Sequence, residues 1–150
     1  MPSIETCISQ AIRARVATIS LPYPVIWTDG EPVAVPASGG QPVPFIEAHH
    51  EPNRNARPFI GSKDASERRG ILLLTLCWPI AKVGTGSGKT HKDAIREMAA
   101  SNIAGHFFTD VSMTFQGIRV RVMKVPDVLG SYRDDAYLRT QVSIQLETQR

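Results

Sequence analysis

Apolar residues recur every three or four positions between residues 3 and 19, the spacing of one face of an α-helix. Ser3 can cap the start of this helix through its hydroxyl, and Glu5 suits its first turn. Proline cannot continue a helix, so Pro22 and Pro24 mark its end. The stripe expected to face the core consists of Ile4, Cys7, Ile8, Ala11, Ile12, Val16 and Ile19.

A second helical pattern runs from about Thr90 to Phe108, after a glycine-rich turn at residues 82–90. Its charged residues Lys92, Asp93, Arg96 and Glu97 are expected to lie away from the core. The apolar stripe is expected to consist of Ile95, Met98, Ala99, Ile103 and Phe107.

Five segments have strand patterns: residues 25–27, 43–50, 71–81, 118–125 and 136–147. Residues 71–81 are apolar on both faces, so both faces of this strand should be covered, by helices or by a second subunit. Pro79 is expected at a sheet edge or outside the ladder. The last segment alternates cleanly and should form, with residues 118–125, an antiparallel pair with one solvated face. Residues 125–132 between them are expected to be a turn region.

The order α-β-β-β-α-β-β predicts an α+β fold, a mostly antiparallel sheet with two helices packed on it, in one domain spanning residues 1–150. Two long polar stretches, residues 28–42 and 51–69, interrupt this pattern. Eight of the eleven prolines fall between Pro22 and Pro58. Long loops in a small domain are usually functional, so these stretches are interpreted as arms that become ordered on a neighbouring molecule.

The amino-acid composition is typical of a globular domain and indicates no particular catalytic or binding chemistry. Hydrophobic residues make up 42% and charged residues 21% of the chain, and the formal net charge of +3 permits nucleic-acid contact without requiring it. No apolar run reaches the ~20 residues of a membrane helix, and the N-terminus lacks a signal-peptide pattern, so we expect a cytoplasmic protein with no membrane contact. Cys7 and Cys77 occupy apolar positions and are interpreted as buried free thiols.

Residues 83–90, VGTGSGKT, resemble a phosphate-binding P-loop between a strand and a helix. The strict pattern requires glycine where Val83 stands, and too little chain follows for a parallel sheet with several crossovers. We therefore interpret the turn as a flexible connection. A simple anion site at Gly86, Gly88, Lys89 and Thr90 stays open.

The remaining candidate sites are weaker. His49 and His50 are adjacent on a strand, so they point to opposite faces and do not readily share a metal. Asp134 and Asp135 are interpreted as solvated turn residues. Four arginines could form a basic strip on the outer sheet face, although a solvated face is the simpler interpretation: Arg119, Arg121, Arg133 and Arg139. No catalytic arrangement, metal site or cofactor site is predicted.

Several segments taken together resemble a known family. They are IRARVATI at residues 12–19, YPVIW at 23–27, the long stretch from Arg68 to Phe108, and residues 117–148. Landmarks are Gly70, the glycines from Gly84 to Gly88, and the pattern Tyr137-x-Arg139-x-x-Val142-x-Ile144. This order resembles the small tail-terminator or tail-completion proteins of phages and prophages, of the minor tail protein U type.

The resemblance implies a structural subunit of the virion, present in the host cytoplasm during assembly. Such subunits form a ring, typically a hexamer, on the head-proximal end of the tail tube. The ring stops tube polymerisation and joins the neck protein, and DNA passes through its lumen without tight binding. Trp78 on the doubly apolar strand and the outer strand positions Arg119, Arg121, Tyr137 and Arg139 are then candidate subunit contacts.

Three alternatives stay open at this point. A head–tail connector ring has a closely similar pattern. A small nucleotide-binding protein would use Gly84–Thr90, and Lys89→Ala would abolish its ATP binding. A nucleic-acid-binding module would use the arginine-bearing strands and would bind DNA with a steep dependence on salt.

Overall fold

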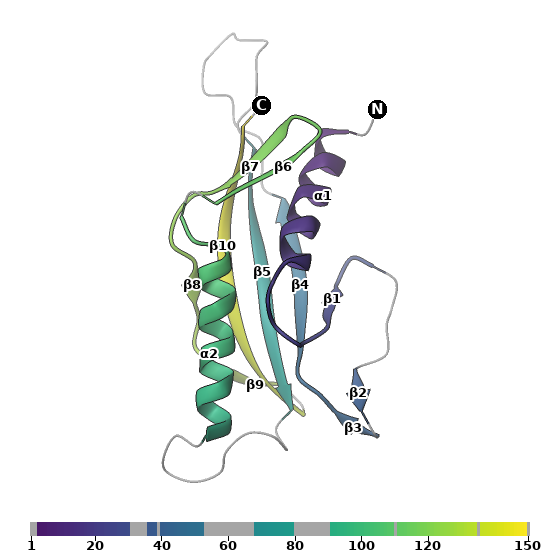
Figure 1. Cartoon of the computed structure of the whole chain (residues 1–150), viewed down its shortest axis with the longest axis vertical. Helices are drawn as coiled ribbons and strands as arrows, with labels where there is room; N and C mark the ends of the chain where they lie inside the picture. The colour runs from purple at the N-terminus through teal and green to yellow at the C-terminus, as the bar shows by residue number, and fades with distance from the viewer. Residues whose placement is uncertain are drawn as a thin grey trace.

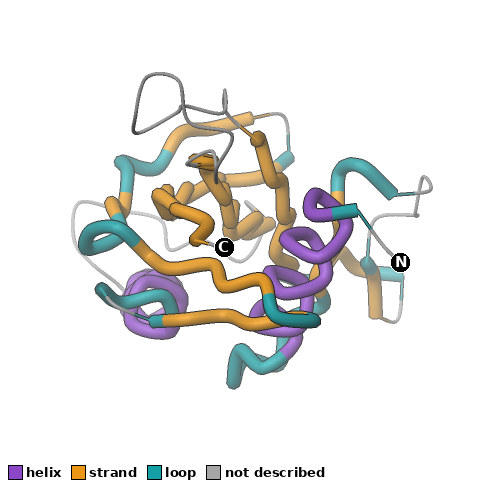
Figure 2. Tube along the Cα trace, turned by 90° about the horizontal axis from the view of Figure 1, so that it is seen from above, coloured by secondary structure: helices purple, strands orange, loops and turns teal. Residues whose placement is uncertain are grey.

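The structure, a computed structural model, describes residues 3–30, 36–38, 40–52, 68–79, 91–109, 111–134 and 136–149. Two helices lie against one curled sheet, as Figures 1 and 2 show. The helices are α1 (Ile4–Ala17) and α2 (His91–His106). The strands are β1 (Val25–Trp27), β2 (Ala37–Ser38), β3 (Gln41–Pro42), β4 (Phe45–Pro52), β5 (Arg68–Pro79), β6 (Ser112–Phe115), β7 (Ile118–Val122), β8 (Asp127–Val128), β9 (Tyr132–Asp134) and β10 (Tyr137–Gln149). The predicted α+β class and the order of the main elements are confirmed.

The main sheet has the order β1-β4-β5-β10-β7-β6, with β8 and β9 also paired to β10. The strand pairs are antiparallel, apart from the parallel pair β1–β4. β5 and β10 form the centre and pair without interruption from Pro79↔Tyr137 to Arg68↔Thr148. Pro79 is therefore the last residue of a central strand, and it lies beyond the β4 ladder, which ends at Phe45↔Cys77.

α1 begins as predicted, with the Ser3 hydroxyl accepting a hydrogen bond from the Thr6 amide at 3.1 Å. Its buried face consists of Cys7, Ile8, Ala11, Ile12 and Val16. The helix makes its most extensive strand contacts with β6 and β7, because this hairpin folds across the end of the sheet toward it (Figure 1). Gln116 and Gly117 both have positive φ, of 48° and 81°, which is typical of the tight turn that joins such a hairpin.

α2 packs on β10, β5 and β8. Ala99, Ala100, Ile103 and Phe107 are buried, which confirms most of the predicted stripe whose side chains are described. Met98 is an exception, because its side chain is 65% exposed. It shares its side of the helix with the exposed residues Asn102 and Gly105, four and seven positions later.

The core lies between the helices and the inner face of the sheet. Every second residue of β5 and β10 points into it, and many of these side chains are completely buried, such as Leu72, Leu74, Leu76, Val142 and Ile144. Cys7 and Cys77 are free and buried, as predicted. Arg139 pairs with Cys77 in the ladder, so both side chains belong to the opposite, outer face of the sheet.

The segment predicted as a turn, residues 125–132, is instead part of an irregular edge along β10. Five residues separate Val122 from Val128, whereas only three separate their partners Leu146 and Val142, so two residues bulge out. One more residue bulges between β8 and β9. Pro126 lies in the first bulge, because proline has no amide to donate to a ladder.

The two predicted arms are only partly described. Residues 36–38 and 40–42 carry the small β2–β3 ladder within the stretch interpreted as an arm. β4 continues to Pro52 and β5 starts at Arg68, which shortens the second predicted arm at both ends. Residues 31–35, 39 and 53–67, and the glycine-rich turn with Gly86, Gly88, Lys89 and Thr90, lie outside the described residues.

Candidate functional site: the outer sheet face and the β8–β9 edge

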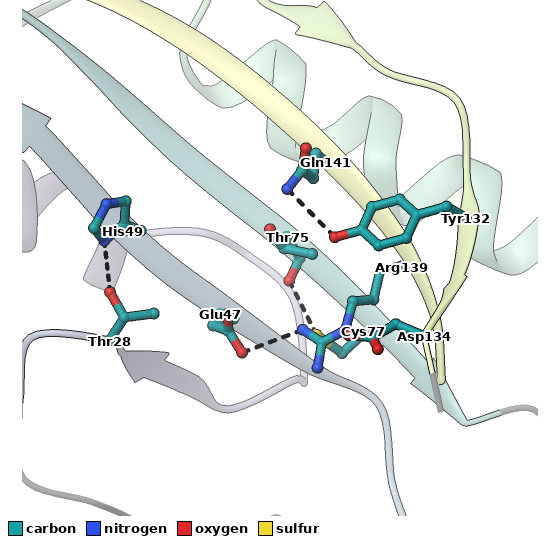
Figure 3. A network of polar contacts seen from close by, with 9 residues as sticks. All are labelled: Thr28, Glu47, His49, Thr75, Cys77, Tyr132, Asp134, Arg139 and Gln141. Atoms are coloured by element: carbon teal, nitrogen blue, oxygen red, sulfur yellow. Dashed lines mark hydrogen bonds and ion pairs between the residues drawn. The ribbon is translucent and has the colours of Figure 1, made fainter. Parts of the chain in front are cut away.

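The outer face of the sheet carries a polar network centred on Arg139 (Figure 3). Its guanidinium lies 3.2 Å from the Glu47 carboxylate on β4 and 2.9 Å from the Asp134 carboxylate on β9. The Asp134 contact joins Nε to Oδ2 without hydrogen-bond alignment, so it is an ion pair only. Arg139 is 19% exposed and Glu47 35%, whereas Asp134 is 55% exposed. One arginine therefore connects β10 to β4 and to β9.

Cys77 lies beneath this network on β5, and its Sγ is 3.3 Å from Nη1 of Arg139. Burial raises the pKa of the Cys77 thiol to about 11, although Arg139 works in the opposite direction. The sulfur contacts the carbonyl of Thr75 at 3.7 Å. A thiol with this pKa is protonated at neutral pH, so Cys77 is a structural residue and a poor nucleophile.

The contacts of these arginines do not support the alternative of a basic strip on the outer face. Arg139 is balanced by two carboxylates, and Arg121 lies 3.6 Å from Glu147. Arg119 donates to the Ser112 hydroxyl at 3.2 Å. Arg133 pairs with Leu138 in the ladder, so alternation places it on the opposite face from Arg139. The arginines therefore form no continuous basic surface.

The candidate subunit contacts lie in different environments. Trp78 is 5% exposed and packs edge-on against Tyr23, so it belongs to the core and offers almost no area to a neighbour. Tyr137 is half-buried and packs edge-on against Phe45 on the outer face. Arg119 and Arg121 lie on β7, on the same face as Tyr137 and Arg139. Four of the five candidates thus share the outer face, but at opposite ends of β10: Tyr137 and Arg139 lie at its start, and Arg119 and Arg121 lie beside Gln149 and Glu147 near its end.

The irregular edge at residues 123–134, called the β8–β9 edge below, is a feature that the sequence patterns did not reveal. It carries the exposed apolar residues Val125, Val128, Leu129 and Tyr132, with exposed fractions between 44% and 52%. Polar contacts hold it on β10: the Ser131 hydroxyl is 2.6 Å from that of Thr140, and Gln141 donates to the Tyr132 hydroxyl at 3.5 Å. The sequence signal for this edge is the cluster of these apolar residues, which lies in the segment predicted as a turn.

The two adjacent histidines point to opposite faces, as expected. His49 contacts the Thr28 hydroxyl at 2.7 Å, whereas His50 lines a cavity of about 360 Å³ between α1 and the ends of β4, β5 and β10. A Cβ on Gly70 would approach Nε2 of His50 to 3.0 Å and the Glu51 carbonyl to 3.3 Å, so a larger residue would require His50 to shift. Burial lowers the pKa of His50, so it is neutral in this cavity near pH 7. In the part of the chain that the structure describes, no cluster of three potential metal ligands occurs.

The two helices meet at their C-terminal ends through a reciprocal contact. Arg15 donates to the carbonyl of His106 at 2.7 Å, and the His106 ring lies 3.0 Å from the carbonyl of Arg15 and 2.8 Å from the Thr18 hydroxyl. The Arg15 charge thus lies beside the negative ends of both helix dipoles. Burial lowers the pKa of His106, which favours its neutral form.

A comparison with protein families bears on these alternatives. The family model described as "Phage tail terminator protein" matches residues 7–146. This chain belongs to the phage tail terminator family. The tail-terminator resemblance inferred from the sequence is thereby confirmed, and the chain is a structural component of a phage tail.

Comparisons of structure and of individual proteins add little about function. One solved structure superimposes with a TM-score of 0.66 at 19% sequence identity, covering 95% of this chain and 96% of the other. At this identity it shows a shared fold, and its title states no function. No curated protein matches the sequence. Neither described helix of this tail terminator is long and apolar enough to cross a membrane.

Proposed function

We propose that this tail terminator forms a ring, most simply a hexamer, on the head-proximal end of the tail tube. The ring ends tube polymerisation and then offers the surface to which the neck protein of the DNA-filled head binds. The observation that carries the proposal is the family match over residues 7–146. A closed ring also requires each subunit to present two different contact surfaces, and the sheet has open edges on opposite sides of the molecule (Figure 1).

The charge pattern supports passage of DNA through such a ring without tight binding. Strong nucleic-acid binding depends on lysines and arginines that neutralise phosphates. On the outer face, Arg139 and Arg121 are instead neutralised by carboxylates of the same chain. We therefore expect only weak, salt-sensitive DNA binding by the outer face.

Tube assembly in vitro tests the function directly. Tail tube protein of the same phage is polymerised with and without the purified terminator, and tube lengths and ends are measured by electron microscopy. We expect added terminator to stop growth and to leave a ring at one end of each tube. Unchanged tube lengths and bare ends would refute the proposal.

Solution mass with and without Mg-ATP separates this role from nucleotide binding at residues 84–90. A mass and thermal stability that are indifferent to Mg-ATP agree with a purely structural subunit. A stabilisation by Mg-ATP that disappears in Lys89→Ala would favour the P-loop interpretation. Binding of the purified protein to neck assemblies but not to tubes would favour a connector ring.

A further inference from the structure

The main sheet has three open edges among the described strands: β1, β6 and the β8–β9 edge. β1 pairs only with β4, β6 only with β7, and β8 and β9 only with β10. Six large apolar side chains in the described chain are strongly exposed, and four of them lie on the β8–β9 edge: Val125, Val128, Leu129 and Tyr132. The β8–β9 edge is therefore the open edge at which most of these exposed apolar side chains lie.

The exposed apolar residues lie on both sides of the edge. Val128 pairs with Val142 and points toward the side of the helices, whereas Tyr132 pairs with Arg139 and its hydroxyl accepts from Gln141, which places Tyr132 on the outer face. Between this edge and α2 lies a groove of about 270 Å³, whose lining includes Ala100, Val128 and Leu129. Exposed apolar surface on both faces of an open edge is costly in an isolated chain and indicates a protein partner.

We infer that the β8–β9 edge receives the β1 edge of a second copy of this chain. This inference rests on the proposed ring. β1 lies on the opposite side of the molecule from β8 (Figure 1), so one copy can present β1 while its own β8–β9 edge accepts the next copy. Such a head-to-tail contact repeats from copy to copy, and it gives a ring when the rotation between neighbouring copies closes after a whole number of subunits. The contact joins the two sheets edge to edge, as in other recognition modes that add a strand.

Side-chain directions fit this pairing. Ile26 pairs with Glu47 and therefore belongs to the outer face, like Tyr132. Val25, Ile26 and Trp27 are each half-buried and so keep apolar surface for a neighbour.

The apolar area exposed on the β8–β9 edge limits how strong its contact with a second copy is. Four half-exposed side chains amount to on the order of 300 Å² of apolar surface, compared with about 800 Å² buried by each partner in a stable complex. The edge contact alone is therefore too small for a stable dimer in dilute solution. We expect rings to persist on the tube end, where neighbouring copies are held side by side.

Cross-linking on capped tubes tests the inference. Leu129→Cys and Ile26→Cys are combined in one chain and treated with a bis-maleimide, while Cys7 and Cys77 stay protected by burial. We expect a ladder of covalent oligomers up to the full ring. A mixture of the two single-cysteine proteins should give dimers only, and either single variant alone should give none.

The matched control places the second cysteine on the third edge. Ser112→Cys with Leu129→Cys should give no ladder, although Ser112 is also exposed on an edge strand. Tubes that are capped while the Ile26/Leu129 pair gives no ladder would overturn the inference and leave the proposed function intact. Tubes that wild-type protein fails to cap would overturn both.

A charge substitution gives an independent test. Val128→Asp should abolish capping with little change in thermal stability, because Val128 is 48% exposed in the isolated chain. Met98→Asp, at a residue 65% exposed on α2, should cap normally. Normal capping by Val128→Asp would contradict the inference.

Discussion

Removing the charge of Glu47 is expected to destabilise the subunit more than removing the charge of Asp134, although both carboxylates contact Arg139. At 3.2 Å the Glu47 pair has a gross attraction of about 5 kcal/mol at an effective dielectric constant of ~20. Desolvation and ordering of the two side chains offset most of this attraction. We expect a net loss of about 1–2 kcal/mol for Glu47→Gln.

Asp134 is 55% exposed, so solvent screens its contact even though the atoms lie only 2.9 Å apart. Exposed ion pairs contribute about 0.2–1 kcal/mol, and Asp134→Asn should cost no more than that. The different exposure of the two carboxylates also predicts how their couplings to Arg139 respond to salt. The coupling of Arg139 to Asp134 should fade in ~0.5 M NaCl, whereas the half-buried coupling to Glu47 should largely persist.

Urea unfolding of a double-mutant cycle measures these couplings. Arg139→Met keeps most of the apolar stem and removes the charge, and it is combined in turn with Glu47→Gln and with Asp134→Asn. The m-value should stay constant across the set, which shows that the change lies in stability. A coupling to Asp134 equal to or larger than that to Glu47 would refute the reasoning from burial.

The other predictions concern the core, a turn, the thiols and pH. Phe107→Ala should cost about 3–5 kcal/mol in urea unfolding, because the ring is completely buried. Gly117→Ala should cost about 1–2 kcal/mol by the same assay, since the residue has φ of 81°. Cys7 and Cys77 should not react with a thiol reagent at pH 7 until the protein is unfolded, and rapid labelling of the native protein would contradict their burial. Burial lowers the pKa of His106 below its ordinary value of 6.5, so the unfolded chain binds this proton more readily. Stability from His106 is therefore complete above about pH 6.5 and is lost as the pH falls through the lower folded value. Thermal melts from pH 7.5 to 5 should show a smaller loss for His106→Gln than for the wild type.

Regular periodicity was enough to predict both helices and the long strands. The alternation of residues 136–147 continues along most of β10, and the helical spacing gave all five buried residues of α1 as neighbours on one face. The short strands β6, β8 and β9 were missed because two to four residues hold too little alternation to stand out. Met98 shows a second limit, because apolar character alone does not show which side of a helix is buried.

The candidate site was harder to predict than the fold. Glu47 and Arg139 are separated by 92 positions, and only the strand order β4-β5-β10 brings them together. Without their partners, the arginines looked like a basic strip. The apolar edge could not be predicted for a related reason. Residues 123–134 form an open edge because no further described strand pairs with β8 and β9, and the sequence pattern does not show which strands are neighbours.

The central pairing of β5 with β10 has a consequence for how the subunit becomes competent to assemble. Every residue of β10 lies far along the chain from its β5 partner, and contacts of this kind close large loops and form slowly during folding. β8 and β9, by contrast, pair with parts of β10 that lie only 3 to 16 residues further along the chain, so these contacts are local and form readily before β10 docks on β5. The apolar edge at residues 125–132 is therefore exposed while the core is still incomplete. Pairing of β10 with β5, rather than formation of the edge, is then the slow step that precedes assembly.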